Sequence, residues 1–236
     1  MNALPWIVVP YLAAALFVGG HVWRWRFDRL GWTSRSSQLL EQRWLRVGSP
    51  LFHVGLLGVV GGHVIGILVP ARATRAVGVS DHLYHVVALA AGSVFGVLAL
   101  AGIVILTLRR LLVRRVRRNG TPVDIAVDLF LLAVIGLGMG ETLGWQLGVG
   151  EYAYRETVSI WFRQLLLLHP DASLMSGAPW VYQAHTLASL TLFALWPFSR
   201  LVHVWAAPVQ YVLRRAHILY RPAPAETRRA TLPQRP

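Results

Sequence analysis

The chain has no cysteine and no lysine, and charged residues make up only 14% of its 236 positions. Without cysteine there is no disulfide, thiolate-ligated iron–sulfur cluster or covalently attached c-type haem within this chain. Any redox cofactor must therefore be held by histidine or methionine. The scarcity of charge also argues against a water-soluble domain, since 55% of the residues are hydrophobic and the charges cluster between long uncharged runs.

Five hydrophobic segments are long enough to cross a bilayer, for which a helix needs roughly 20 mostly apolar residues. The predicted fold class is therefore all-α: a membrane protein built as a five-transmembrane-helix bundle, with residues 1–236 forming a single membrane domain. The first segment is expected to be a retained helix, because MNALPW carries no basic signal-peptide region. The five helices are expected at about residues 3–24, 47–69, 84–108, 124–148 and 181–206.

The basic residues are all arginines, and most lie between alternate hydrophobic segments. Although the net charge of +13 could suggest a nucleic-acid partner, this distribution favours a membrane topology instead. The positive-inside rule places the N-terminus outside and the C-terminus in the cytoplasm. Two smaller pieces follow from the same pattern: an outer loop at 149–180 with a short amphipathic surface helix, and a basic cytoplasmic tail at 207–236 that suits a partner or anionic lipid. The arginines expected inside are Arg24, Arg26, Arg29, Arg35, Arg43, Arg46, Arg109, Arg110, Arg114, Arg115, Arg117, Arg118, Arg214, Arg215, Arg221, Arg228, Arg229 and Arg235.

Four histidines fall inside two of the predicted helices: His53 and His63 in the second, His185 and His203 in the fifth. Because these helices run in opposite directions, depth pairs His53 with His203 near the cytoplasm and His63 with His185 near the outer face. Ionisable groups inside a membrane are costly and usually serve ions, protons or cofactors. Two histidines at equal depth on antiparallel helices can ligate one haem iron from both sides, so the set predicts two haems.

The spacing of the histidines conflicts with two straight helices. On one helix they are 10 residues apart and on the other 18 residues apart, which corresponds to roughly 15 Å against roughly 27 Å of rise. The first spacing also leaves its two side chains about 80° apart around the helix, whereas the second returns to the same face. Helix tilt, the rotamers of the histidines and a bend near Pro197 would have to absorb the difference, since proline removes a backbone hydrogen bond and kinks the helix.

Each of these features also has an ordinary structural explanation. A single buried histidine is more often a satisfied structural residue, and the glycines of the second helix, at 55, 58, 61, 62 and 66, either admit a flat macrocycle or serve close helix packing. The matched set of four histidines favours haem. Arg200 either reaches the lipid headgroups or contacts a haem propionate. His85, at the outer mouth of the third helix, suits a quinol as proton acceptor or is an ordinary interfacial histidine.

The stretches WRWRFDRLGWTSRSSQLLE, LFHVGLLGVVGGHVIGILVP and PFSRLVHVWAAPVQYVLRR strongly resemble the gamma subunit of membrane-bound respiratory nitrate reductase, a di-haem cytochrome b. The likeness covers nearly the whole chain. It implies a five-helix anchor in the bacterial cytoplasmic (inner) membrane that holds two haem b groups. It also implies an iron–sulfur beta subunit and a molybdenum-containing alpha subunit on the cytoplasmic side, where nitrate itself is reduced.

The resemblance also implies residue roles and a reaction. The outer-haem ligands fall on His63 and His185 and the inner-haem ligands on His53 and His203, the pairing that depth also gives. Gly62 matches the quinol-site motif; some family members have a lysine at the start of the third helix, and His85 is the candidate for that role here. Electrons would pass from menaquinol or ubiquinol at the outer face through both haems to the iron–sulfur subunit.

Two other functions are compatible with the residues alone. One is the cytochrome b anchor of another quinone-linked reductase, which co-purifying subunits would distinguish. The other is a transporter or structural anchor without a cofactor, in which the histidines are only hydrogen-bonded; a visible spectrum separates it from a haem protein.

Overall fold

The computed structural model describes residues 4–28 and 37–205, and all regular structure in these ranges is helical. The predicted tail at 207–236 lies outside the described residues. Four helical runs are long and apolar enough to cross a membrane: Leu4–Phe27, Arg43–Leu68, Asp81–Leu112 and Pro122–Gly148. This confirms the all-helical class, and it shows that the first four predicted segments are helices long and apolar enough to cross a membrane.

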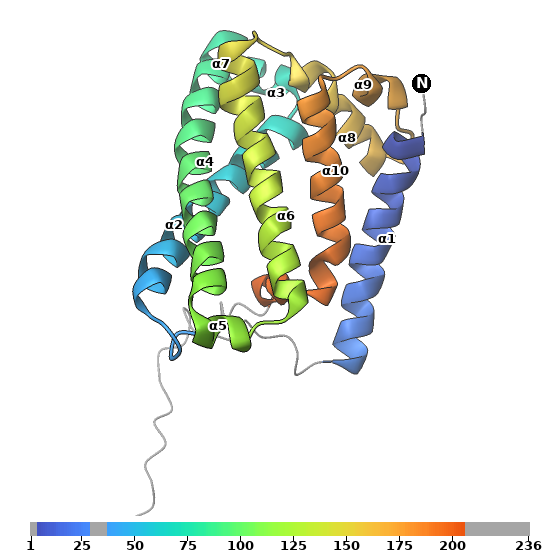
Figure 1. Ribbon diagram of the computed structural model, residues 1–236. Coiled ribbons are helices and arrows are strands. Elements are labelled where there is room, and N and C mark those ends of the chain that lie inside the picture. Colours follow the sequence, from blue (N-terminus) through green and yellow to red (C-terminus); the bar gives the residue numbers. More distant parts are fainter. Residues whose placement is uncertain (1–3, 29–36, 206–236) are drawn as a thin grey trace, which may run out of the picture.

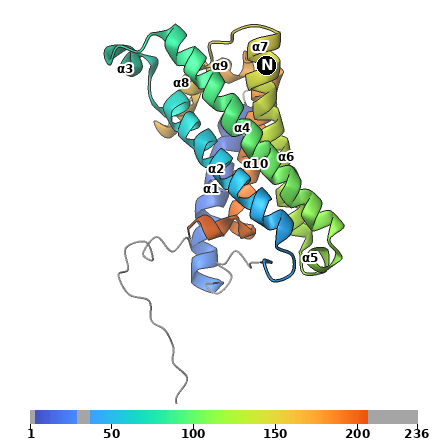
Figure 2. The ribbon, with the colours of Figure 1, turned by 90° about the vertical axis from the view of Figure 1, so that its left-hand side faces the viewer.

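The long helices stand side by side as a bundle (Figure 1). Helix α1 is Leu4–Phe27, α2 is Arg43–His63, α4 is Asp81–Leu112, α6 is Pro122–Met139 and α10 is Trp180–Leu195. Neighbours around the bundle follow the order α2, α4, α6, α10 and α1. Figure 2 shows α2 crossing α4 on one side, with α1 and α10 behind them.

Short helices close the two ends of the bundle. At one end lies α5 (Arg114–Arg118), and at the other lie α3 (Ala71–Ala76), α7 (Gln146–Gly148), α8 (Val158–Leu166) and α9 (Ala172–Ser176) (Figure 1). We call these the α5 end and the α7 end. A 3-10 turn, η4 (Tyr154–Glu156), precedes α8, which packs its apolar face into the bundle with Trp161 only 1% exposed.

The limits of α4 and α6 follow from local chemistry. Ser80 accepts a hydrogen bond from the backbone N–H of Leu83 and caps α4, and Thr121 forms a reciprocal capping box with Asp124 at the start of α6. These caps satisfy backbone N–H groups that have no partner within the helix. Both helices therefore begin at fixed residues, which sets the register of everything that packs on them.

Two of the long helices end in π-helical turns. Helix α2 continues as η2 (Val64–Leu68) and α6 continues as η3 (Gly140–Trp145). Side chains of η4 and α8 bond to the carbonyls of η2 and its C-cap: Ser159 donates to the carbonyl of Gly66, Arg163 to that of Ile67, and Arg155 to that of Val69, at 3.0, 2.7 and 3.1 Å. These two elements thus fix the end of α2 just beyond His63.

The predicted fifth helix is interrupted. Helix α10 ends at Leu195, the 3-10 turn η5 (Trp196–Phe198) contains Pro197, and Ser199 is extended, with φ −118° and ψ −178°. A second 3-10 helix, η6 (Arg200–Val204), then begins. The proline prevents continuation because it lacks an N–H and clashes with the preceding turn. The predicted bend is therefore a complete break, and only 16 residues form a continuous helix here.

The glycines of α2 divide between the two roles weighed from the sequence. A Cβ at Gly55 would collide with the backbone of Ala99, and one at Gly58 with the ring of Phe95, so both serve close packing on α4. A Cβ at Gly61 or Gly62 would meet nothing within 4 Å. Only this second pair leaves room beside α2 for a flat group.

Adding one methyl group at the α2–α4 contact should therefore destabilise the folded protein. We expect Gly55→Ala to cost about 1–3 kcal/mol, the usual penalty of overpacking, because the new Cβ meets backbone that cannot rotate away. Gly19→Ala is the matched control, since no atom lies within 4 Å of a Cβ there. Thermal unfolding in detergent should show a lower midpoint for the first variant only; equal midpoints would contradict the assigned contact.

Candidate functional site

The structure brings the four candidate histidines together as two facing pairs. The ring centroids of His63 and His185 lie 6.0 Å apart with an interplanar angle of 24°. Those of His53 and His203 lie 6.2 Å apart with an angle of 71°. In both pairs α2 supplies one ring and the α10–η6 segment supplies the other. The pairs are separated along α2 by the ten-residue spacing, or roughly 15 Å.

Every one of these rings is oriented by a backbone carbonyl. The carbonyl of Val59 lies 2.8 Å from Nδ1 of His63, and the carbonyl of Val134 lies 2.9 Å from Nδ1 of His185. The carbonyl of Ser49 is 2.8 Å from Nδ1 of His53, and that of Arg200 is 2.7 Å from Nδ1 of His203. A carbonyl only accepts, so each neutral ring carries its proton on Nδ1 and presents an unprotonated Nε2.

This arrangement suits a metal ion between the rings of each pair. A metal ion bound by two opposite imidazoles lies about 2 Å from each nitrogen. With the ring radii added, the two ring centroids are then roughly 6 Å apart, which agrees with the centroid distance in both pairs. A second hydrogen bond from Nδ1 is the usual support of a metal-bound histidine. The tautomer and the spacing thus fit the donor set of a two-histidine site.

The described residues place two imidazoles at each position. Within residues 4–28 and 37–205 no group of three or more histidine, cysteine, aspartate or glutamate side chains is placed to hold a metal ion. A cofactor that carries its own metal needs no third side chain and is compatible with a two-histidine site. The open side of Gly61 and Gly62, next to His63, is compatible with a flat group.

The break after α10 removes the conflict between the two histidine spacings. The chain turns aside at Ser199, and η6 lies across the α5 end of the bundle instead of continuing the axis of α10 (Figure 1). His203 therefore does not lie the full roughly 27 Å from His185 that a straight helix would impose. The shorter segment brings His203 level with His53.

The remaining candidates occupy opposite ends. His85 lies in the first turns of α4 at the α7 end, with its Nε2 3.4 Å from a carboxylate oxygen of Glu151. The end of α2 reaches the same region, because a Cβ at Gly66 would lie 3.0 Å from the hydroxyls of both Tyr84 and Tyr154. Arg200, at the α5 end, contacts Asp124 at 2.7 Å. The propionate contact considered from the sequence stays a prediction.

Some supporting residues give little signal in the sequence. Arg24 reads there as one more basic interfacial residue, yet it is buried and donates to the carbonyls of Pro197 and Ser199. Ser159 and Arg163 read as parts of an amphipathic surface helix, yet they bond to the end of α2. The proline and serine of WPFS were the available sign that carbonyls near the break would need outside donors.

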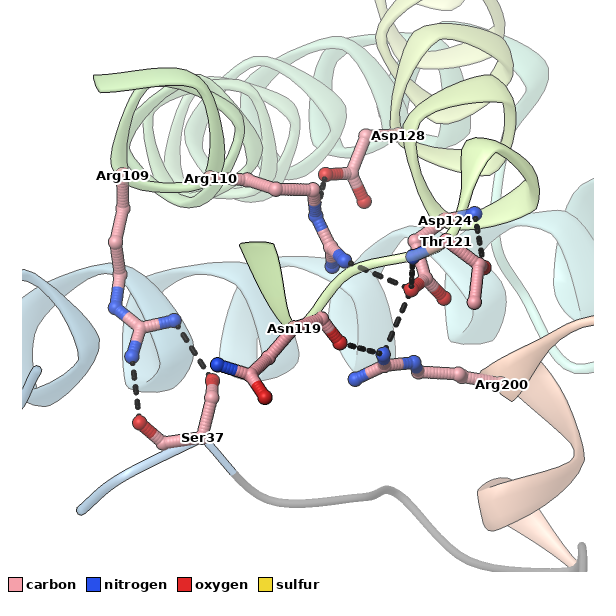
Figure 3. Close-up of polar contacts among 8 residues, drawn as sticks. All are labelled: Ser37, Arg109, Arg110, Asn119, Thr121, Asp124, Asp128 and Arg200. Carbon is pink, nitrogen blue, oxygen red and sulfur yellow. Dashed lines mark hydrogen bonds and ion pairs between the residues drawn. The ribbon is translucent and has the colours of Figure 1, made fainter. Parts of the chain in front are cut away.

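The loop before α2 is fastened by one arginine of α4. Arg109 donates to the Glu41 carboxylate at 2.6 Å and to the Glu41 carbonyl at 2.7 Å. It also donates to the hydroxyl and carbonyl oxygens of Ser37 (Figure 3). The Arg109 side chain is only 5% exposed. This contact fixes where α2 starts, and therefore the position of His53 ten residues further on.

Fold and site together define a helical membrane-type protein in which two facing histidine pairs are stacked within one bundle. The chain belongs to the nitrate reductase gamma subunit family, whose model matches residues 2–223. It is 44% identical to the nitrate reductase gamma chain of Bacillus subtilis, over 92% of this chain and 96% of that one. It is 32% identical to the respiratory nitrate reductase 1 gamma chain of Escherichia coli, over 93% and 97%.

The chain also resembles part of a longer protein. It is 47% identical to the nitrate reductase-like protein NarX of Mycobacterium tuberculosis, over 94% of this chain but only 34% of NarX. The similarity to the two gamma chains, in contrast, extends over nearly their full length.

The Arg109–Glu41 contact should make stability depend on pH. Burial disfavours the charged form of Glu41, but hydrogen bonds from Arg109 and the backbone N–H groups of Trp44 and Arg43 outweigh it, so the pKa of Glu41 lies below its usual 4.5. A lowered pKa means stabilisation that is present above pH 4.5 and lost as the pH falls through the folded value. We expect Glu41→Gln to cost about 2 kcal/mol at pH 7.

Thermal unfolding of the parent and of Glu41→Gln at pH 7 and pH 4 measures this dependence. The difference between the two proteins should narrow at the lower pH. Glu156→Gln is the control, because Glu156 is exposed and lies at the opposite end. A constant difference at both pH values would mean that the charge of Glu41 contributes nothing.

Proposed function

We propose that this chain is the di-haem b membrane subunit of a respiratory nitrate reductase, which oxidises quinol at the α7 end and delivers electrons at the α5 end. The observation that carries the proposal is the geometry of the two histidine pairs: centroids 6.0 and 6.2 Å apart, with Nδ1 of every ring near a carbonyl. Membership of the gamma subunit family supports it independently.

His63 and His185 would hold the outer haem, and His53 and His203 the inner one. Each bound haem would supply a one-electron couple, whose potential depends on its axial ligands and their hydrogen bonds. The chain itself fixes the separation of the two sites through α2 and orients all four imidazoles through backbone carbonyls.

Quinol oxidation, from menaquinol or ubiquinol, would take place where α2 ends beside the start of α4. Gly62 leaves space next to His63, and His85 Nε2 is the proposed acceptor of a quinol proton. Glu151, whose side chain is 74% exposed, lies 3.4 Å from that nitrogen and can pass the proton to water. Two protons would thus leave at the α7 end while two electrons cross to the α5 end.

The proposed topology has five spans, with the N-terminus outside and the C-terminus in the cytoplasm of a bacterium, across its inner membrane. Helix α10 covers roughly 24 Å of a hydrocarbon core of roughly 30 Å, so η5 would continue the fifth crossing to the α5 end, where the chain turns aside into η6. The arginines of α5 favour the cytoplasmic side. There they would face the iron–sulfur beta subunit, which in turn carries electrons to the molybdenum-containing alpha subunit.

The topology can be tested with single cysteines, because the chain has none of its own. Val77 lies 77% exposed between α3 and α4, and Arg118 is exposed at the end of α5. In intact cells a membrane-impermeant maleimide should label Val77→Cys but not Arg118→Cys. Labelling of both after permeabilisation is the control for reactivity, and the reverse pattern in intact cells would invert the topology.

Removal of one ligand of the proposed outer haem should distinguish the outer haem site from the inner one. We expect His63→Ala to lose the outer haem, keep the inner haem, and lower quinol-dependent electron transfer by about a hundredfold or more, beyond the 10–100-fold typical of outer-shell partners. A redox titration of the visible b-type bands in the purified complex measures both sites. His169→Ala, in the exposed loop, is the control.

The same spectrum decides between the proposed function and a cofactor-free anchor. A parent complex without reducible b-type bands would refute the haem assignment, and two unchanged components in His63→Ala would refute the choice of ligand.

A further inference from the structure

The position of His203 depends on a segment that cannot hold its own shape. Helix η6 has only five residues and is of the 3-10 type, which is rarely stable in longer runs, and a helix this short is not stable by itself. It follows a break that separates it from the hydrogen bonds of α10. The direction in which His203 points is therefore set by what fastens η6 to the rest of the bundle.

One fastening lies just before η6. Arg24 of α1 is 9% exposed and donates from Nη1 to the carbonyls of Pro197 and Ser199, at 2.7 and 2.9 Å. Carbonyls at the end of a helix lack the N–H groups of a following turn, and a buried one needs another donor. The guanidinium therefore fixes the break itself, directly before η6 begins.

A second fastening lies within η6. Nη2 of Arg200 is 2.7 Å from Oδ2 of Asp124, whose side chain is 4% exposed at the start of α6 (Figure 3). The same nitrogen is 3.5 Å from the carbonyl of Asn119. Oδ2 of Asp124 also accepts the backbone N–H of Thr121 at 2.8 Å as part of the capping box. The carboxylate is thus rigidly placed, and Arg200 ties η6 to it.

The ion pair belongs to a small network with balanced charge. Arg110 of α4 contacts Asp124 at 3.4 Å and Asp128 at 2.6 Å, so two arginines share two carboxylates across α4, α6 and η6 (Figure 3). A buried charge that loses its partner is strongly unfavourable. Loss of either Arg200 or Asp124 would therefore release η6 and leave the remaining network with an uncompensated charge.

Arg200 is connected to His203 through its backbone. The carbonyl of Arg200 lies 2.7 Å from Nδ1 of His203 and so sets the orientation of that ring. The side chain of Arg200 is held by α6, its carbonyl holds the imidazole, and the imidazole faces His53 at 6.2 Å. This sequence of contacts runs from α6 to the inner histidine pair.

We propose that Arg200 and Asp124 are positioning residues for the inner histidine: their ion pair holds η6 against α6 so that His203 faces His53. The inference rests on the proposed function, in which these histidines hold the inner haem. It gives Arg200 a role different from a contact with the haem itself, because Arg200 acts through the segment that carries the ligand.

The test uses the whole complex in membranes, with optical redox titration and electron paramagnetic resonance of both haems. The parent must first show two components; if it does not, the proposed function fails rather than this inference. With Arg200→Gln we expect the inner component to lose occupancy by about tenfold or more, as for other outer-shell partners, or to shift in potential and resonance position. The outer component should be unchanged, and Arg200→Lys, which keeps the charge, should largely restore the inner one.

Two further variants separate positioning from other roles. Asp124→Asn keeps an oxygen for the capping bond to Thr121 but loses the charge, so it should reproduce the Arg200→Gln effect. Arg110→Gln removes the contacts of Arg110 with Asp128 and Asp124 but keeps the Arg200–Asp124 pair, so its inner component should resemble the parent.

Three results would overturn the inference. An unchanged inner component in Arg200→Gln would show that the ion pair is not needed. A change in Arg200→Gln but not in Asp124→Asn would mean that Arg200 acts directly on the cofactor. Equal loss of both components in Arg200→Gln, Asp124→Asn and Arg110→Gln would mean a general loss of stability.

Discussion

A neutral imidazole in a membrane bundle needs an acceptor for its one N–H and leaves one nitrogen lone pair free to bind. In this structure the acceptor is a backbone carbonyl. Each of the four paired histidines places Nδ1 within 2.9 Å of a carbonyl. For His53 and His63 the carbonyl comes from the preceding turn of the same helix, whereas His185 uses Val134 of α6. The lone pair is then on Nε2, and the helices must be arranged so that the Nε2 atoms of each pair face one another.

The break after α10 is the main device that makes this arrangement possible. A continuous fifth helix would carry His203 too far along the bundle to meet His53. Ending the helix at Leu195 solves that problem but leaves carbonyls without donors and a short segment without support. Arg24 and Asp124, from α1 and α6, supply what the broken helix lacks. Basic and acidic residues near the bundle end thus serve its internal geometry.

Much of this could be predicted from the sequence, because hydrophobic runs report membrane helices directly. The ends of the first four apolar helices lie within four residues of the predicted ones, and pairing by depth predicted that His63 faces His185 and that His53 faces His203. The break was only partly predicted: Pro197 indicated a bend, but the extended conformation of Ser199 depends on tertiary contacts. The π-helical turn at Val64–Leu68 has no local signature, since the side chains that donate to its carbonyls come from α8, some 90 residues further along the chain.

The roles of the α2 glycines could not be predicted for a similar reason. The sequence shows where the glycines are, but not on which face of the helix a neighbouring helix packs. Gly55 and Gly58 pack on α4, while Gly61 and Gly62 do not. The family resemblance, which rests on the histidine-bearing stretches, is confirmed by the match over residues 2–223.

The charge-balanced network at the α5 end has a consequence for how this end responds to ionic strength. Arg110, Arg200, Asp124 and Asp128 neutralise one another in a largely buried group, which dissolved salt screens poorly. The exposed arginines of α5, in contrast, lie in water, where the Debye length is about 8 Å under physiological conditions. Salt should thus weaken attraction between this face and an acidic surface long before it disturbs the contacts beneath it. The α5 end thus has a surface whose interactions depend on salt, directly beside an ion-pair network that hardly depends on it.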